Sequence, residues 1–270
     1  MKSHDFGQFI FNNSILDKSQ IINLIKTSKH SKPTLAVEAL FLQLLQADEL
    51  SRDDEEFVRT LITPRQAARA FELKDGQSLW FAQSIIDNKI ANYSQLESIL
   101  EKYHDLQIPP VESVLTTYYE QLKTQAIIDF PFAVDIVNNF HSFLSENFQS
   151  SVLVMPPVSN DSSQKLGASV KIIGEIPTVI GLLADETVFM QIAKRYDSYV
   201  EELEDAYDAI SELLNVFTGQ FVVNIAVTRG LDEEPEPPRF GNTSDFFNFI
   251  SLFSDVGYFY LYIGKDEIFS

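Results

Sequence analysis

Glu212 and Asn215 are the residues of this chain whose types and spacing could do chemistry together. Apolar residues recur around them at helical intervals, so Val200 to Val227 predicts one long helix. Asp208, Glu212 and Asn215 then fall at i, i+4 and i+7 and share one polar stripe. An amide and a carboxylate three residues apart can be presented together to a partner, and a helix holds them more rigidly than a loop would. The alternative is an ordinary solvated helix face, on which the two residues have no joint role.

The spacing beyond this pair favours the chemical interpretation. Three residues separate Asp208 from Glu212, two separate Glu212 from Asn215, and twenty-one separate Asn215 from Pro237. Gly219 follows Asn215 by four positions. This pattern resembles the signature of the chemotaxis phosphatase family of CheC, CheX and FliY, in which a glycine often stands at the position of Gly219.

The resemblance covers about residues 127–270, and its single motif copy is similar to CheX rather than to the two-copy CheC. It implies a phosphatase whose substrate is a CheY-like response-regulator receiver domain carrying an aspartyl phosphate. Asn215 would orient the attacking water, and Glu212 would pair with a lysine of the receiver. Catalysis of phosphoryl transfer is mostly positioning and charge stabilisation. The Mg²⁺ ion would belong to the receiver, so the resemblance implies no cofactor of the chain's own.

Three alternatives stay open at this point. Asp208 either contacts the partner or is a solvated neighbour of Glu212. The domain either hydrolyses the phosphate or docks on a receiver as a scaffold of a two-component or chemotaxis pathway. In a third interpretation, the N-terminal half makes the protein a nucleotide-responsive regulator.

Composition excludes several classes of function. The chain has 270 residues, no cysteine and a net charge of −19, so disulfides, thiolate metal sites and cysteine nucleophiles are excluded. Residues 126–270 carry 7 Lys and Arg against 22 Asp and Glu. Such an acidic surface repels phosphate backbones, so nucleic acid and anionic membranes are not expected partners. With no signal-peptide pattern and no apolar run of the length that spans a bilayer, a cytoplasmic location is expected.

Residues 1–125 predict an all-α domain with an internal repeat. Residues 9–25 align with residues 84–100 at an offset of 75, and each unit predicts a helix, a polar turn and a second helix. Ser19 and Ser94 are the expected N-caps of the second helices. The repeat is faintly similar to helical N-terminal modules of type II secretion ATPases, some of which bind cyclic di-GMP. The arginine of those modules is missing, so packing or partner docking is expected rather than nucleotide binding.

Residues 126–270 predict an α+β domain, because helices and strands come in separate runs. The resemblance implies the same: an antiparallel sheet with long helices on one face. Strands are expected near residues 152–155, 166–173, 178–183, 246–253 and 257–263, and helices at 130–148 and 185–195. The aromatic segment Tyr258 to Ile263 could form an edge strand that joins two copies into a homodimer, or it could be core.

Overall fold

A computed structural model describes residues 6–28, 34, 37, 76–122, 130–148, 150–156, 164–243 and 249–269. The chain divides into two compact units. The first comprises Met1–Pro110 with Gln149–Ser151, and the second comprises Val111–Phe148 with Val152–Ser270.

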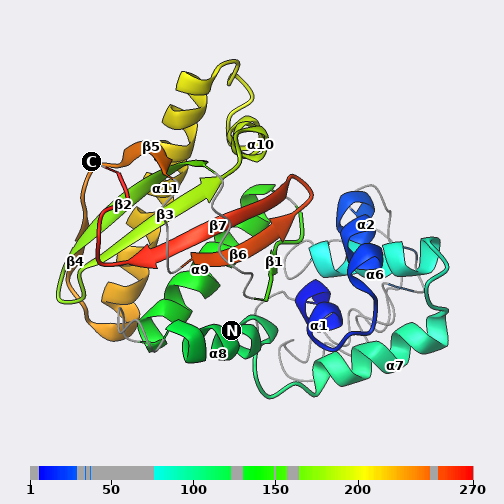
Figure 1. The fold of residues 1–270 in the computed structure, drawn as a ribbon. Helices are drawn as coiled ribbons and strands as arrows, with labels where there is room; N and C mark the ends of the chain where they lie inside the picture. The colour runs from blue at the N-terminus through cyan, green and yellow to red at the C-terminus, as the bar shows by residue number, and fades with distance from the viewer. Residues whose placement is uncertain are drawn as a thin grey trace, which may run out of the picture. The chain divides into compact units, whose positions relative to one another are not determined.

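The described part of the first unit is helical, as the sequence predicts. Its helices are α1 (Phe6–Asn12), α2 (Lys18–Ser28), α6 (Gly76–Asp87) and α7 (Tyr93–His104) (Figure 1). Aromatic rings hold the two copies of the repeat together, since the Tyr103 ring lies 5.3 Å from that of Phe6 and 5.4 Å from that of Phe9. The edge-on and tilted geometries are those that aromatic pairs favour.

The two repeat units share individual hydrogen bonds at the offset of 75 residues. Gln8 Nε2 donates to Asn12 Oδ1 at 2.9 Å, and Gln83 Nε2 donates to Asp87 Oδ1 at 2.7 Å. The turns between helices place Ser14 and Lys89 in the same left-handed conformation, with φ of 50° and 55°. The two turns therefore have the same backbone conformation, so the repeat in the sequence is also a repeat in the structure.

The predicted N-caps were wrong by two residues. Asp17 and Asn92 cap the second helices: Gln20 N donates to Asp17 Oδ1 at 2.8 Å, and Gln95 N donates to Asn92 Oδ1 at 2.9 Å. The glutamine side chains bond back to the cap backbone and complete two capping boxes. The Ser19 hydroxyl instead donates to Asp17 Oδ1, which lowers the pKa of that carboxyl together with the bond from Gln20 N.

The second unit is an α+β domain, which confirms the predicted fold class. Its strands are β1 (Leu153–Val154), β2 (Lys165–Gly174), β3 (Thr178–Ala184), β4 (Glu233–Pro235), β5 (Arg239–Thr243), β6 (Phe249–Ser254) and β7 (Gly257–Gly264). Every pairing is antiparallel, and the order is β1-β6-β7-β3-β2-β4, with β5 also on β2. Its helices are α8 (Pro110–Leu122), α9 (Phe130–Phe148), α10 (Glu186–Tyr196) and α11 (Leu203–Arg229).

Successive side chains along each strand point to opposite faces of the sheet, and both faces are buried. Alternate residues of β2, β3, β6 and β7 meet the helices in the main core, for example Val170, Leu182 and Leu261. Their neighbours face the other way into a smaller cluster that the C-terminal residues Ile268 and Phe269 help to cover. The helices α9 and α11 therefore lie on one face of the sheet (Figure 1).

Of the two alternatives for the aromatic segment, the edge strand is wrong and the core position is confirmed. β7 is an interior strand, paired along one side with β6 and along the other with β3. Its side chains Phe259 and Leu261 are fully buried, so the aromatics belong to the core. An edge-to-edge contact with a second copy through this strand has no free backbone groups to use.

The division between the units also differs from the predicted boundary at residue 125. Val111, Leu115 and Tyr118 of α8 are buried in the core of the second unit. The Tyr118 hydroxyl accepts from Ser251 N at 3.1 Å and donates to Met155 O at 2.6 Å, which ties α8 to β6 and to the end of β1. Burial raises the pKa of this phenol. The helix before residue 125 thus belongs to the C-terminal unit.

Candidate functional site on helix α11

Helix α11 is continuous from Leu203 to Arg229, and Gly230 ends it in the left-handed conformation at φ 70°. Glycine adopts this conformation without a Cβ penalty, so it suits the end of a helix. One side of the helix is buried along its length. Phe217 contacts Phe140 of α9 with ring centroids 4.9 Å apart, and Phe221 contacts Phe132 at 5.6 Å.

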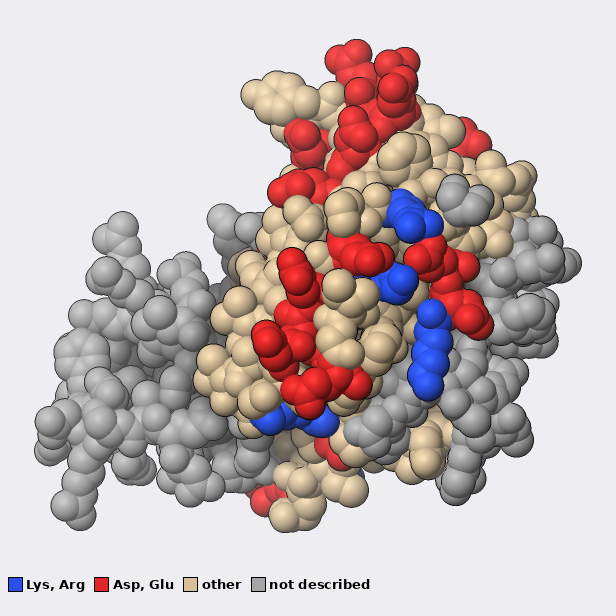
Figure 2. Space-filling view, turned by 90° about the vertical axis from the view of Figure 1, so that its left-hand side faces the viewer, with Lys and Arg blue, Asp and Glu red and all other residues tan. Residues whose placement is uncertain are grey.

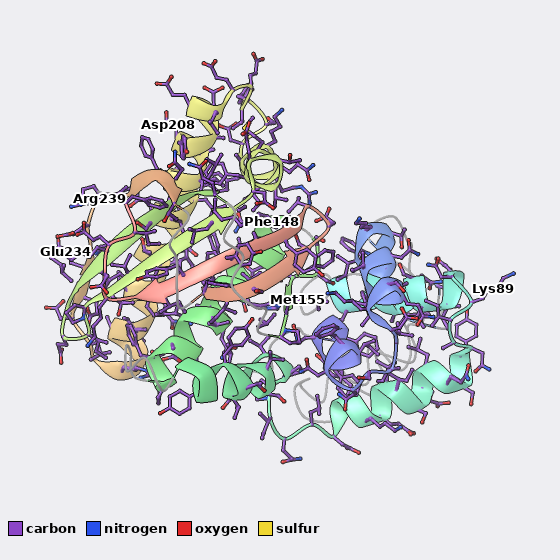
Figure 3. The ribbon with its side chains drawn as sticks, in the orientation of Figure 1. Lys89, Phe148, Met155, Asp208, Glu234 and Arg239 are labelled. Atoms are coloured by element: carbon purple, nitrogen blue, oxygen red, sulfur yellow. The ribbon has the colours of Figure 1, made fainter. Side chains whose placement is uncertain are left out.

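The three motif side chains lie on the opposite side. Asp208, Glu212 and Asn215 are all exposed, whereas Leu213 and Leu214 between them are fully buried. Figure 3 shows Asp208 near the start of the helix. Because a helix rises 1.5 Å per residue, Asn215 lies about 4.5 Å along the axis from Glu212. The structure thus brings the predicted pair together on a rigid, outward-facing stripe.

These side chains are available to a partner. Within the described ranges, the side chains of Asp208, Glu212 and Asn215 form no hydrogen bond or ion pair. A polar side chain already bonded inside its own protein would lose that bond on engaging a ligand. Here the Asn215 amide and the Glu212 carboxylate carry no such penalty.

Tyr196, at the end of α10, is a neighbour of Glu212 that sequence reasoning missed. Its phenol is half-buried, and burial first and the Glu212 charge second raise its pKa. The Asp197 charge acts in the same direction. Tyr196 belongs to α10 rather than to α11, so no local sequence pattern could have placed it beside the motif.

An aromatic pair lies beside Asp208. The rings of Tyr207 and Phe240 stack with centroids 4.9 Å apart and planes at 27°, and Phe240 remains 52% exposed. The Tyr207 hydroxyl donates to Gly241 O at 3.2 Å. Burial raises the pKa of Tyr207, and the charge of Glu186 adds to that effect. The pair attaches β5 to α11 at the N-terminal end of the polar stripe.

Pro237, the last motif residue, lies between β4 and β5. Both short strands pair with β2, so together they form one interrupted edge of the sheet. Proline has no N–H to donate and is therefore tolerated at such a break. The sequence predicted an acidic loop before Pro237, and the structure instead places the short strand β4 within it.

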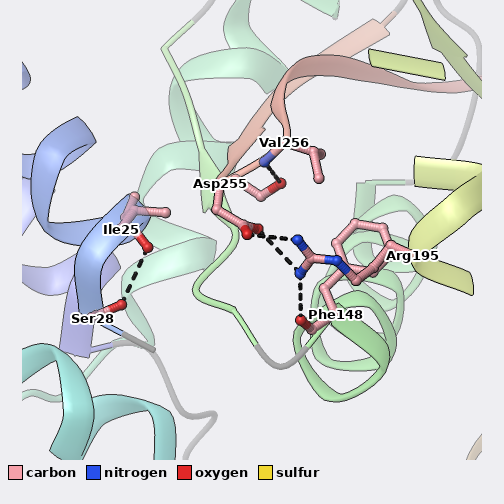
Figure 4. Close-up of polar contacts among 7 residues, drawn as sticks. Ile25, Ser28, Phe148, Arg195, Asp255 and Val256 are labelled. Carbon is pink, nitrogen blue, oxygen red and sulfur yellow. Dashed lines mark hydrogen bonds and ion pairs between the residues drawn. The ribbon is translucent and has the colours of Figure 1, made fainter. Parts of the chain in front are cut away.

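An ion pair holds the end of α10, from which the chain leads into α11. Arg195 Nη2 lies 2.7 Å from Asp255 Oδ2 in the β6–β7 turn, and Arg195 Nη1 donates to Phe148 O at 2.8 Å (Figure 4). The Asp255 side chain is only 5% exposed. At the other end of α10, Asp185 is the N-cap residue, but its side chain forms no capping hydrogen bond. Its carboxylate pairs with the buried Lys165 at 2.7 Å.

Asp205 organises the start of α11. Its carboxylate accepts from Glu202 N at 3.0 Å and from Glu201 N at 2.9 Å, and these bonds lower its pKa, that from Glu202 most. A lowered folded-state pKa gives stability that is present above the unfolded pKa and is lost as pH falls through the folded one. We therefore expect Asp205→Ala to lower the melting temperature at pH 6, with the difference from wild type shrinking below about pH 4. A difference that is constant from pH 7 to pH 3 would contradict this role.

The surface around these elements is strongly acidic (Figure 2). The exposed acids at the start of α11 include Glu201, Glu202 and Glu204. In the part of the chain that the structure describes, no three His, Asp or Glu side chains group as metal ligands. Among those residues α11 alone is long and apolar enough to cross a membrane by length and composition. A core helix with one buried face passes the same test, as this one does.

Comparisons with known proteins place the C-terminal half among proteins of similar fold. No protein-family model matches the chain, and no curated protein matches it. The chemotaxis protein CheX from Desulfovibrio desulfuricans is 16% identical, with a TM-score of 0.40 over 49% of this chain and 97% of that one. CheX from Vibrio vulnificus is 13% identical, with a TM-score of 0.43 over 50% and 98%. A CheX–CheY–BeF3–Mg²⁺ complex from Borrelia burgdorferi is 14% identical, with a TM-score of 0.40 over 51% and 97%. The similarity concerns the fold alone.

Proposed function

We propose that this protein is a phosphatase that removes the aspartyl phosphate of a CheY-like receiver domain in a response regulator. The observation that carries the proposal is the exposed Glu212–Asn215 pair on α11, whose side chains form no hydrogen bond or ion pair among the described residues. The pair stands within the complete motif from Asp208 to Pro237. A rigid helix can insert such a pair into another protein's active site without first ordering a loop.

The proposed chemistry needs little from this chain beyond positioning. Asn215 enters the receiver's active site, where its amide accepts a hydrogen bond from the attacking water and holds it in line with the phosphorus. Glu212 pairs with a receiver lysine and fixes the register of the complex. The Mg²⁺ ion bound by the receiver stabilises the charge on the phosphoryl group, so this protein supplies no metal ligand.

The lifetime of phosphorylated receivers tests this function. Each receiver domain of the same organism is phosphorylated, and its decay is followed with and without the protein. We expect the lifetime of at least one receiver to shorten with the concentration of this protein. Unchanged lifetimes for all of them would contradict the proposal, and a stable complex without faster decay would identify a docking scaffold instead.

Glu212→Gln separates partner binding from chemistry. The variant keeps the shape of the side chain but loses its charge, so we expect KM for the phosphorylated receiver to rise about tenfold with kcat nearly unchanged. Glu204→Gln, which removes another exposed charge from the same helix, is the matched control. If Glu212→Gln instead lowers kcat at constant KM, Glu212 acts on the reacting atoms rather than on docking.

A further inference from the structure

The exposed stripe of α11 changes character beyond Asn215. Gly219 lies about 6 Å further along the helix axis, Val223 about 12 Å and Val227 about 18 Å. Val223 is 64% exposed and Val227 is 81% exposed, although both are apolar and β-branched. The polar Glu212–Asn215 pair is therefore followed along the helix by exposed apolar side chains, in a line that turns about 40° around the helix axis at each step of four residues.

Gly219 has no structural reason inside the described chain. A Cβ built at this position would meet nothing within 4 Å, so neither packing nor a close backbone contact there excludes a side chain. Glycine in the interior of a helix is destabilising relative to alanine, because it restricts the unfolded chain less. The space that the missing side chain leaves lies outside the helix, one turn beyond Asn215.

The apolar residues nearby divide clearly into two sets. Phe221 and Ile225 are buried against the core of their own unit. Asn224 donates to Asn139 Oδ1 of α9 at 2.7 Å, which shows which side of α11 that helix covers. The side chains of Val223 and Val227 take part neither in the core packing nor in the contact with α9. Nothing that the structure describes of this chain covers them.

A protein interface of ordinary size, centred on Asn215, would extend along α11 toward these valines. A specific interface buries about 800 Å² on each partner, which corresponds to a patch roughly 30 Å across. A receiver centred on Asn215 would then extend about 15 Å along α11 in each direction. Such a patch includes Gly219 and Val223, and Val227, about 18 Å from Asn215, borders it.

We propose that Gly219, Val223 and Val227 form an apolar docking surface for the same receiver domain, with closest approach over Gly219. This inference rests on the proposed phosphatase function and names the surface by which the substrate is held. The receiver packs an apolar surface beside its phosphorylated aspartate onto this stripe, and the absent side chain of Gly219 lets the two surfaces meet. Glu212 then provides charge recognition on one side of Asn215, and the valines provide apolar contact on the other.

Added bulk at Gly219 tests the closest approach. We expect Gly219→Phe to raise KM for the phosphorylated receiver more than tenfold while kcat changes less than twofold. Thr228→Phe adds the same ring at an exposed position about 180° around the helix from Gly219, and should leave KM unchanged. Gly219→Ala should raise the melting temperature, since the position is open, and should still raise KM about threefold.

Each outcome decides the proposal. If Gly219→Phe has wild-type KM while the wild-type protein hydrolyses the receiver phosphate, the docking surface is wrong and the phosphatase function stands. If the wild-type protein hydrolyses no receiver phosphate, the function and this inference both fail. The Val223→Ser/Val227→Ser double variant should raise KM about tenfold. If it instead separates a dimer in sedimentation and leaves KM unchanged, the surface binds a second copy and the proposal is overturned.

Discussion

Asn215→Ala is expected to abolish measurable dephosphorylation while the protein remains folded. The substitution removes the amide that holds the attacking water in line, and lost positioning of a reacting group costs about a hundredfold or more in rate. The side chain is exposed and forms no hydrogen bond within the described residues, so its removal should leave the unfolding free energy within about 0.5 kcal/mol of wild type. The measurements are the decay of the phosphorylated receiver and chemical denaturation.

Asn215→Asp sharpens this test. It preserves the shape of the side chain but places a negative charge where the phosphoryl oxygens approach, so we expect it to be as inactive as Asn215→Ala. Asp208→Asn is the control on the same stripe, and it should retain at least half of the wild-type kcat. A fully active Asn215→Ala would remove Asn215 from the mechanism, whatever Asp208→Asn does.

Arg195→Met is the change with the largest expected effect on stability. It takes the guanidinium from a carboxylate that is only 5% exposed and removes the donor to Phe148 O. Breaking a buried ion pair by removing one member costs about 3 kcal/mol or more, because the other charge stays buried. We expect the melting temperature to fall by about 6–12 °C in a unit of this size.

The Arg195→Met/Asp255→Asn double variant separates the ion pair from the packing of the long side chain. With the Asp255 charge also removed, the double variant should be more stable than Arg195→Met alone. A double variant that loses the sum of the two single effects would show that the pair is not coupled. An Arg195→Met protein with wild-type stability would contradict the anchoring role of this contact.

Regular elements could be predicted because their patterns are local. The helical spacing of Leu203, Ile210 and Phe217 is confirmed by α11, and the strands β2, β3 and β7 fall within a residue or two of their predicted bounds. The repeat at an offset of 75 is confirmed by matching turns at Ser14 and Lys89.

The errors arose where tertiary context decides. The aromatic hairpin was readable, but only the strand order shows that β7 lies inside the sheet. Serine and aspartate are both good N-caps, so the composition near Asp17 and Ser19 could not distinguish them. The place of α8 depends on Tyr118, whose hydroxyl bonds to groups far along the chain.

Part of the candidate site could likewise be predicted from the sequence, and part needed the folded structure. Glu212 and Asn215 were predicted from the sequence because their spacing places them on one side of a helix and because the wider pattern from Asp208 to Pro237 resembles the family signature. Their exposure needed the structure, because a helix stripe can face either a core or solvent. Tyr196 and Phe240 come from α10 and β5, so only the folded chain brings them beside the motif. The open space over Gly219 likewise has no sequence signature.

Release of inorganic phosphate from a phosphorylated receiver, with this protein present at one-twentieth of the receiver concentration or so, tests the central claim most directly. The exposed Glu212–Asn215 pair predicts many phosphate molecules released for each molecule of protein, and none above background with Asn215→Ala. Release that stops at one phosphate for each protein molecule, or that persists unchanged in the Asn215→Ala variant, would contradict it.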